Sequence, residues 1–131
     1  MPYPDLDEAR LHHAALRDIF FDRAIGGEDP QQFRQVEELC TAAAAAVDDD
    51  YCRQQMRKVR AYAAEIFSQA GFRKWSSGSL GGAEFLRRMI IMTLDAFRSQ
   101  LASIEALRLA GELRQLGLGR GLDRPDDLTR R

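Results

Sequence analysis

The stretch Met89-Ile90-Ile91-Met92-Thr93-Leu94 decides the fold class of this chain, because it is almost wholly apolar and lies inside a helical pattern. Apolar residues continue the pattern on both sides, namely Phe85, Leu86, Phe97, Leu101 and Ile104. A helix that is apolar nearly all round for two turns must be buried by its neighbours. We therefore expect this segment to be the central helix of a compact helical bundle.

The composition predicts a single globular domain. Of the 131 residues, 45% are hydrophobic and 30% are charged, which are ordinary values for a folded protein and argue against disorder. A chain of this length buries enough apolar surface to fold without disulfides. The net charge of −1 gives no overall field that would draw the chain to nucleic acid or to an anionic membrane.

The sequence predicts neither export nor insertion into a membrane. Residues 1–5 are followed by charged residues rather than by the apolar region of a signal peptide. The longest apolar runs, residues 42–47 and 89–92, are far too short to span a bilayer. We expect a cytoplasmic protein.

Start and stop residues divide the chain into four main helices. The first begins near Asp5, where acidic residues favour the helix dipole, and ends at Gly26-Gly27. Asp29-Pro30 starts the second helix, since aspartate caps a helix and proline suits its first turn. Gly71 ends the third helix, and the fourth runs from about residue 83 to about residue 107.

Apolar residues at steps of three and four predict the buried faces of the first three helices. In chain order these are Leu6, Ala9, His13, Leu16, Phe20 and Ala24; then Phe33, Val36, Cys40, Ala43, Ala44 and Val47; then Tyr51, Val59, Tyr62, Ala63, Ile66, Phe67 and Ala70. We place the boundary between the second and third helices at Asp48-Asp49-Asp50, because three carboxylates repel one another in mid-helix but cap a new helix well. The alternative is one long helix from about residue 30 to about residue 70, since Tyr51 stays in phase with Val47.

The apolar stripe of the fourth helix changes phase near its C-terminal end. Leu109, Leu113 and Leu116 lie about 110° from the preceding stripe at about 100° per residue. One straight helix cannot present both stripes to one core, so the chain either kinks near Gly111 or packs this end against a second molecule.

We expect an all-α, antiparallel bundle of four main helices plus a short C-terminal helical segment. Residues 1–116 would form one domain and residues 117–131 a flexible tail.

The out-of-phase leucines predict a surface for a partner protein. If exposed, Leu109, Leu113 and Leu116 form an apolar patch of the kind that marks an interface, with Arg114 at its rim. The partner would be another protein, a second copy of this chain in a homodimer, or both. The alternative is that this segment folds back as a short fifth helix and covers the leucines itself.

A second candidate site precedes the fourth helix. Residues 71–82 form a glycine- and serine-rich stretch longer than most connections between helices. Backbone amides at a helix start bind anions, and the nearby side chains that would help are Arg73, Lys74, Ser77, Ser79 and Arg87. The alternative is a loop whose glycines only cap the neighbouring helices. The sequence has no P-loop or dinucleotide-binding pattern there.

Catalytic and metal-binding patterns are weak in this sequence. Glu8 and His12 are four apart and share a helix face, but the Glu-x-x-His pairs of di-metal bundles are absent. His13 lies within an apolar stripe, which predicts a partly buried histidine rather than a metal ligand. Cys40 and Cys52 have no spacing typical of a metal site and too large a separation for a disulfide, so we expect reduced apolar fillers. We assign no catalytic residue, metal or cofactor, and we favour a protein that is not an enzyme.

These patterns lead to three functional hypotheses. The preferred one is a small regulatory or adaptor protein that acts through helix-mediated binding to another protein. The second is a sensor that holds a phosphorylated or carboxylate small ligand at the loop before the fourth helix. The third is a nucleic-acid binder, based on four basic residues of the third helix, Arg53, Arg57, Lys58 and Arg60, although the near-neutral net charge argues against it.

Overall fold

The computed structural model describes residues 5–22, 25, 27–67 and 82–117. Within these ranges the regular structure consists of helices and contains no strand, which confirms the all-α helical bundle. The helices are α1 (Leu6–Phe21), α2 (Pro30–Ala46), α3 (Asp50–Ile66) and α5 (Gly82–Gln115). The chain divides into two compact units, residues 1–100 and residues 101–131. The first unit holds α1, α2, α3 and the first part of α5.

The first helix begins where the sequence predicts. The Asp5 side chain accepts a hydrogen bond from the backbone amide of Glu8 at 3.0 Å, which satisfies one of the amides that a helix start leaves without a partner. The buried residues of α1 are Leu6, Ala9, His13, Leu16 and Phe20, as predicted. The helix ends at Phe21 because Asp22 takes an extended conformation. The predicted end at Gly26-Gly27 is therefore about one turn too late, and Ala24 lies outside the described residues.

The predicted break at the three aspartates is confirmed. Val47 takes an extended conformation after α2, and the Asp49 side chain accepts a hydrogen bond from the Cys52 amide at 2.9 Å at the start of α3. Asp29 caps α2 in the same way, with Pro30 in the first turn. The prediction that Tyr51 is buried is wrong, since its side chain is 44% exposed. Because α3 starts anew at Asp50, its register follows Cys52, Met56 and the other buried residues of α3 rather than the phase of α2.

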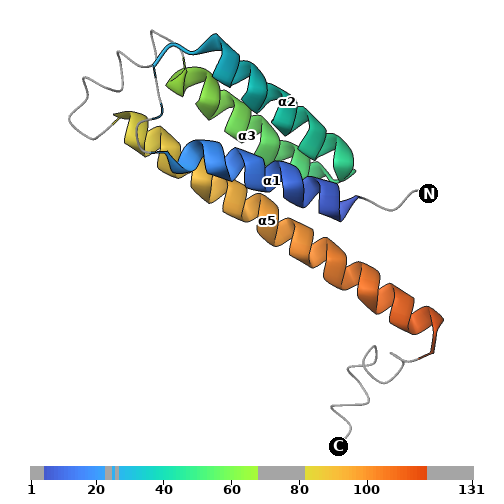
Figure 1. Cartoon of the computed structure of the whole chain (residues 1–131). Coiled ribbons are helices and arrows are strands. Elements are labelled where there is room, and N and C mark those ends of the chain that lie inside the picture. The colour runs from blue at the N-terminus through green and yellow to red at the C-terminus, as the bar shows by residue number, and fades with distance from the viewer. Residues whose placement is uncertain (1–4, 23–24, 26, 68–81, 118–131) are drawn as a thin grey trace, which may run out of the picture. The chain divides into compact units, whose positions relative to one another are not determined.

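Hydrogen bonds between backbones tie the ends of these helices together. α2 packs against both α1 and α3 (Figure 1). The amide of Asp5, before α1, donates to the carbonyl of Ala46 at the end of α2 at 2.9 Å. The amide of Gly27, before α2, donates to the carbonyl of Ile66 at the end of α3 at 3.1 Å. These bonds pair polar backbone groups that the ends of packed helices would otherwise leave unsatisfied.

The helix that contains residues 89–94 is buried along one stripe and not all round. Its buried apolar residues are Leu86, Ile90, Leu94, Phe97 and Leu101, which recur at helical spacing as predicted. Met92 is 64% exposed and Phe85 is 46% exposed, so the expectation of a central helix surrounded by its neighbours is wrong. The apolar run reflects one core-facing stripe together with methionine and phenylalanine side chains on other faces.

The last helix continues beyond its predicted end. α5 runs without interruption from Gly82 to Gln115, so the helix passes both Leu107 and Gly111. It stops where Gly117 adopts a positive φ of 75° and donates its amide to the Arg114 carbonyl at 3.0 Å. A left-handed glycine at this position is a common way to end a helix. Among the described residues, no helix is long and apolar enough to cross a membrane.

Candidate functional site

The last four turns of α5 carry an exposed apolar stripe. Of residues 101–117, Leu101 alone is buried. Leu109 is 47% exposed, Leu113 40% and Leu116 71%. These are the leucines that the change of phase singled out; Leu109 and Leu113 lie on α5, and Leu116 directly follows its last residue, Gln115. Whether they bind a partner stays a prediction.

Two alanines extend this stripe toward the middle of α5. The residues follow steps of four and three, and they are Ala102, Ala106, Leu109, Leu113 and Leu116; we call this set the leucine seam. At about 100° per residue they fall within about 80° of one another. Such spacing is the a/d pattern by which one helix packs along another. The sequence reasoning missed the two alanines, although the step pattern could have revealed them.

Charged residues border the leucine seam. Glu105 and Glu112 lie one heptad, or about two helical turns, apart on the same edge, and Arg114 lies on the opposite side of the seam. The Nε of Arg108 is 3.9 Å from the Glu112 carboxylate, a long ion pair between partly exposed side chains. An apolar centre with charged edges has the composition of a helix-binding surface.

The predicted anion site is described only in part. Arg73, Lys74, Ser77 and Ser79 lie outside the described residues. Arg87 is buried, with 7% of its surface exposed.

The guanidinium of Arg87 already has protein partners. It donates to both carboxylate oxygens of Glu84, at 2.8 and 2.6 Å, and to the backbone carbonyl of Phe20 at 3.0 Å. Hydrogen bonds from Arg87 lower the pKa of Glu84 to about 2. These contacts favour a structural role, in which Arg87 ties the end of α1 to the start of α5. The spacing of Glu84 and Arg87, three apart on a helix, is the signal that could have indicated this pair.

The two histidines have different surroundings. The Nε2 of His12 is 3.3 Å from the Glu8 carboxylate, in keeping with the helix face that the two residues share. His13 is 7% exposed and stacks on Phe97 with 6.2 Å between ring centres. Burial lowers the pKa of His13, which favours the neutral ring. No group of three or more His, Cys, Asp or Glu residues in the described ranges could hold a metal ion.

Both cysteines are free and buried. Burial raises the pKa of the Cys40 thiol to about 12, and burial together with the Asp49 carboxylate raises that of Cys52 to about 12. The thiolate is the nucleophilic form of cysteine, so neither side chain is poised for catalysis at neutral pH. Both behave as the apolar fillers that the sequence predicts.

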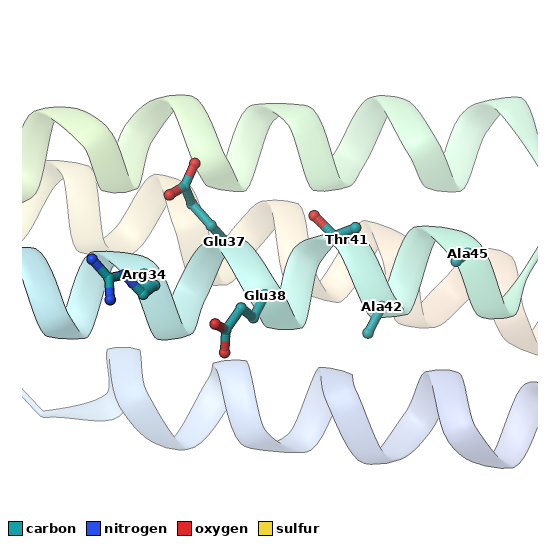
Figure 2. A pocket seen from close by; sticks show the side chains of 6 residues that line it. All are labelled: Arg34, Glu37, Glu38, Thr41, Ala42 and Ala45. Carbon is teal, nitrogen blue, oxygen red and sulfur yellow. The ribbon is translucent and has the colours of Figure 1, made fainter.

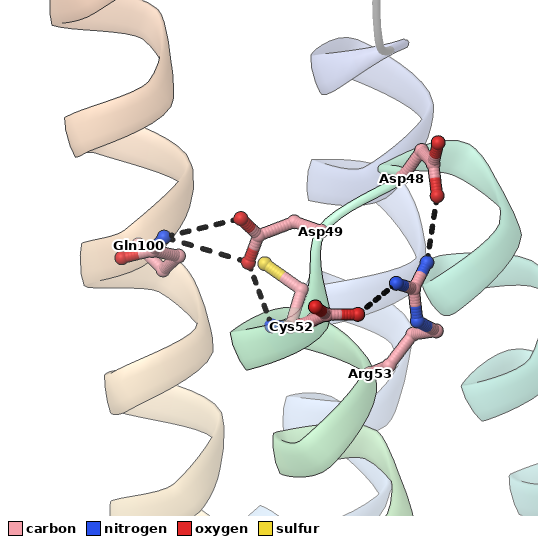
Figure 3. A network of polar contacts seen from close by, with 6 residues as sticks. Asp48, Asp49, Cys52, Arg53 and Gln100 are labelled. Carbon is pink, nitrogen blue, oxygen red and sulfur yellow. Dashed lines mark hydrogen bonds and ion pairs between the residues drawn. The ribbon is translucent and has the colours of Figure 1, made fainter.

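A polar network surrounds the start of α3 (Figure 3). The amide nitrogen of Gln100, on α5, lies 3.4 Å from each carboxylate oxygen of Asp49. On the other side, Arg53 pairs with Asp48 at 2.7 Å and also with Asp50. The network joins α5 to the helix start that Asp49 caps. Its contacts are a helix cap, the hydrogen bonds of Gln100 with Asp49, and the ion pairs of Arg53.

The basic residues of α3 are partly paired with acidic neighbours. Arg53 binds the aspartates, and Arg60 lies 2.7 Å from Glu37 on α2. Two of the four residues on which the nucleic-acid hypothesis rests therefore neutralise carboxylates of the same chain. This weakens the basic face that binding to phosphates requires.

One open hollow lies on the outer face of α2 (Figure 2). Its volume is about 430 Å³, and its lining residues are Arg34, Glu37, Glu38, Thr41, Ala42 and Ala45. The sequence reasoning did not single it out. The lining contains no histidine, cysteine or serine. Its charged residues, Arg34, Glu37 and Glu38, lie toward one end of the hollow, and Thr41, Ala42 and Ala45 lie toward the other.

Comparison of the chain with protein-family models, with curated proteins and with solved structures gives no match.

Proposed function

We propose that this chain is a small adaptor or regulatory protein that binds another protein helix through the leucine seam at the end of α5. The observation that carries the proposal is the exposure of Leu109 and Leu113 on α5 and of Leu116 directly after its end. Exposed leucines in a row are costly in water, because each leaves apolar surface hydrated. A partner helix that covered them would remove this cost.

The size of the seam sets the strength of binding that it can support. Burying a leucine side chain fully is worth about 1.5–3 kcal/mol. Given the fractions already exposed, covering the three leucines contributes about 2.5–5 kcal/mol. Association itself costs at least about 4 kcal/mol in lost freedom of motion. The leucines would therefore support a weak or regulated interaction, with affinity added by polar contacts at the edges of the seam.

The proposal includes no chemical step. The described thiols stay protonated at neutral pH because burial raises the pKa of both. His13 is buried in the core against Phe97. Two reduced, buried cysteines also suit a reducing compartment such as the cytoplasm, which is where we propose that the protein acts.

The test replaces the leucines without disturbing the helix. Glutamine has nearly the helix propensity of leucine, so Leu109→Gln, Leu113→Gln and Leu116→Gln together should remove the apolar surface and keep α5 helical. The matched control is Leu11→Gln on α1, where the leucine is 70% exposed. Tagged forms of the wild type, the triple variant and the control are expressed in cells of the source organism and crosslinked.

The wild type and the Leu11→Gln control should crosslink to the same protein, and the triple variant should lose it. The proposal is wrong if all three forms show the same crosslinked partners and the same oligomeric state.

A further inference from the structure

We infer that the leucine seam receives an amphipathic helix of another protein whose flanking positions are basic, rather than a second copy of this chain. The inference rests on the proposed function and adds the chemistry of the partner. It depends on which charges lie beside the seam and on how two seams would meet.

The seam fixes the positions that flank a bound helix. If Leu109 and Leu116 are d positions and Leu113 is an a position, then Glu105 and Glu112 are g positions. The e positions, Ser103 and Ala110, are small and uncharged. One edge of the seam therefore carries two glutamates, with Arg108 beside Glu112 at 3.9 Å, and the other edge allows a close approach of the partner backbone.

An antiparallel pairing of two copies places like charges together. In antiparallel helix pairs, g positions face g positions. Two antiparallel seams can align in two ways that differ by one heptad. In one alignment Glu112 faces Glu112 of the other copy, and in the other alignment it faces Glu105. Like charges across such an interface are destabilising.

A parallel pairing of two copies gains nothing from the glutamates. There, g positions face the e positions of the next heptad. Glu105 would face Ala110 of the other copy, and Glu112 would face Gly117. The seam also covers only about two heptads, whereas sustained coiled coils extend over three or more. A second copy therefore offers a short apolar contact with no ion pair to strengthen it.

A basic partner helix avoids the repulsion of the antiparallel pairing and supplies the ion pairs that the parallel pairing lacks. Lysine or arginine at its flanking positions would pair with Glu112, and would compete for Glu105 with the contact that this side chain already makes. The existing contact of Glu112 with Arg108, at 3.9 Å, is long enough that a closer cation would displace it at little cost. Leucines of the partner at steps of three and four would fill the spaces beside Leu109 and Leu113.

The experiment uses two synthetic helices of 21 residues, a length chosen as about three heptads. Both have leucine at every a and d position; one has lysine and the other glutamate at every e and g position. Like charges keep each peptide from pairing with itself. Fluorescence anisotropy measures the binding of each peptide to the full chain, to the leucine triple variant and to the double variant Glu105→Lys, Glu112→Lys. The matched control is Glu38→Lys, a charge reversal on the exposed face of α2.

The full chain and the Glu38→Lys control should bind the lysine peptide about three- to tenfold more tightly than the glutamate peptide. This ratio is the size expected when two exposed contacts are ion pairs with lysine instead of repulsive contacts with glutamate. The double variant should reverse this preference, and the triple variant should bind neither peptide.

Three results would overturn the inference in different ways. If the full chain binds both peptides equally and the triple variant binds neither, the seam binds helices but the glutamates do not select them. If the chain binds neither peptide and sediments as a dimer that the triple variant abolishes, a second copy covers the seam and helix-mediated binding survives. If neither peptide binds and the chain is a monomer, both the inference and the proposed function fail.

Discussion

Replacing Asp49 by alanine should destabilise the first unit more than any other single change at the three aspartates. Asp49 caps α3 through the Cys52 amide at 2.9 Å and also contacts Gln100 on α5. Loss of an N-cap side chain costs about 1 kcal/mol, and loss of a carboxylate at a helix start costs about 0.3–1 kcal/mol. The long contact to Gln100 adds at most about 0.5 kcal/mol. We expect the free energy of unfolding to fall by about 1.5–2.5 kcal/mol.

Urea unfolding at pH 7 followed by circular dichroism measures this change. Two control variants separate its causes. Asp49→Asn keeps a capping oxygen and should lose less than half as much. Asp48→Ala removes only an exposed ion pair with Arg53 and should change the midpoint little.

The pH dependence of the same measurement provides a second check. Burial alone would raise the pKa of Asp49, but hydrogen bonds from Cys52 and Gln100 lower it overall. A carboxyl group whose folded pKa is depressed stabilises the fold above its unfolded pKa and loses that contribution as the pH falls. The difference between wild type and Asp49→Ala should therefore shrink below about pH 4. Equal midpoints for Asp49→Ala and Asp48→Ala at pH 7 would refute the reasoning.

Three further predictions concern the core. Because burial lowers the pKa of His13, the unfolded chain binds a proton near pH 6.5, before the folded chain does. The free energy of unfolding, measured with urea, should therefore fall as the pH drops below that value. A His13→Phe variant whose free energy of unfolding falls equally over this pH range would contradict the prediction. Arg87→Met leaves the Phe20 carbonyl unpaired and should lower the free energy of unfolding by about 1–3 kcal/mol, whereas an unchanged midpoint would show that the buried guanidinium contributes nothing. The thiols of Cys40 and Cys52 should react with a thiol reagent at pH 8 only at the rate of unfolding, and labelling that is complete before any unfolding would show that one of them is accessible.

The sequence predicts helix starts better than helix ends in this chain. Asp5, Asp29 and Asp49 cap the helices that the sequence assigns to them, because a side-chain acceptor at a helix start acts locally. The end of α1 at Phe21 and the continuation of α5 past Gly111 were not predicted. Helix ends depend more on tertiary contacts, and a single glycine costs a helix only about 1 kcal/mol.

The candidate sites were also predicted only in part. The change of phase in the last helix pointed to Leu109, Leu113 and Leu116, since periodicity alone reveals a second stripe. It could not show that the stripe stays on one continuous helix. The contact of Arg87 with the Phe20 carbonyl could not be predicted, because a partner 67 residues away in sequence leaves no local signal.

The free energy of unfolding of the leucine triple variant tests the central claim most directly. If Leu109, Leu113 and Leu116 form a binding surface rather than part of a core, replacing all three by glutamine should change the stability of the isolated chain by less than about 1 kcal/mol. A loss of about 4 kcal/mol or more, as expected when leucines leave a packed core, would show that the chain itself uses these side chains to fold.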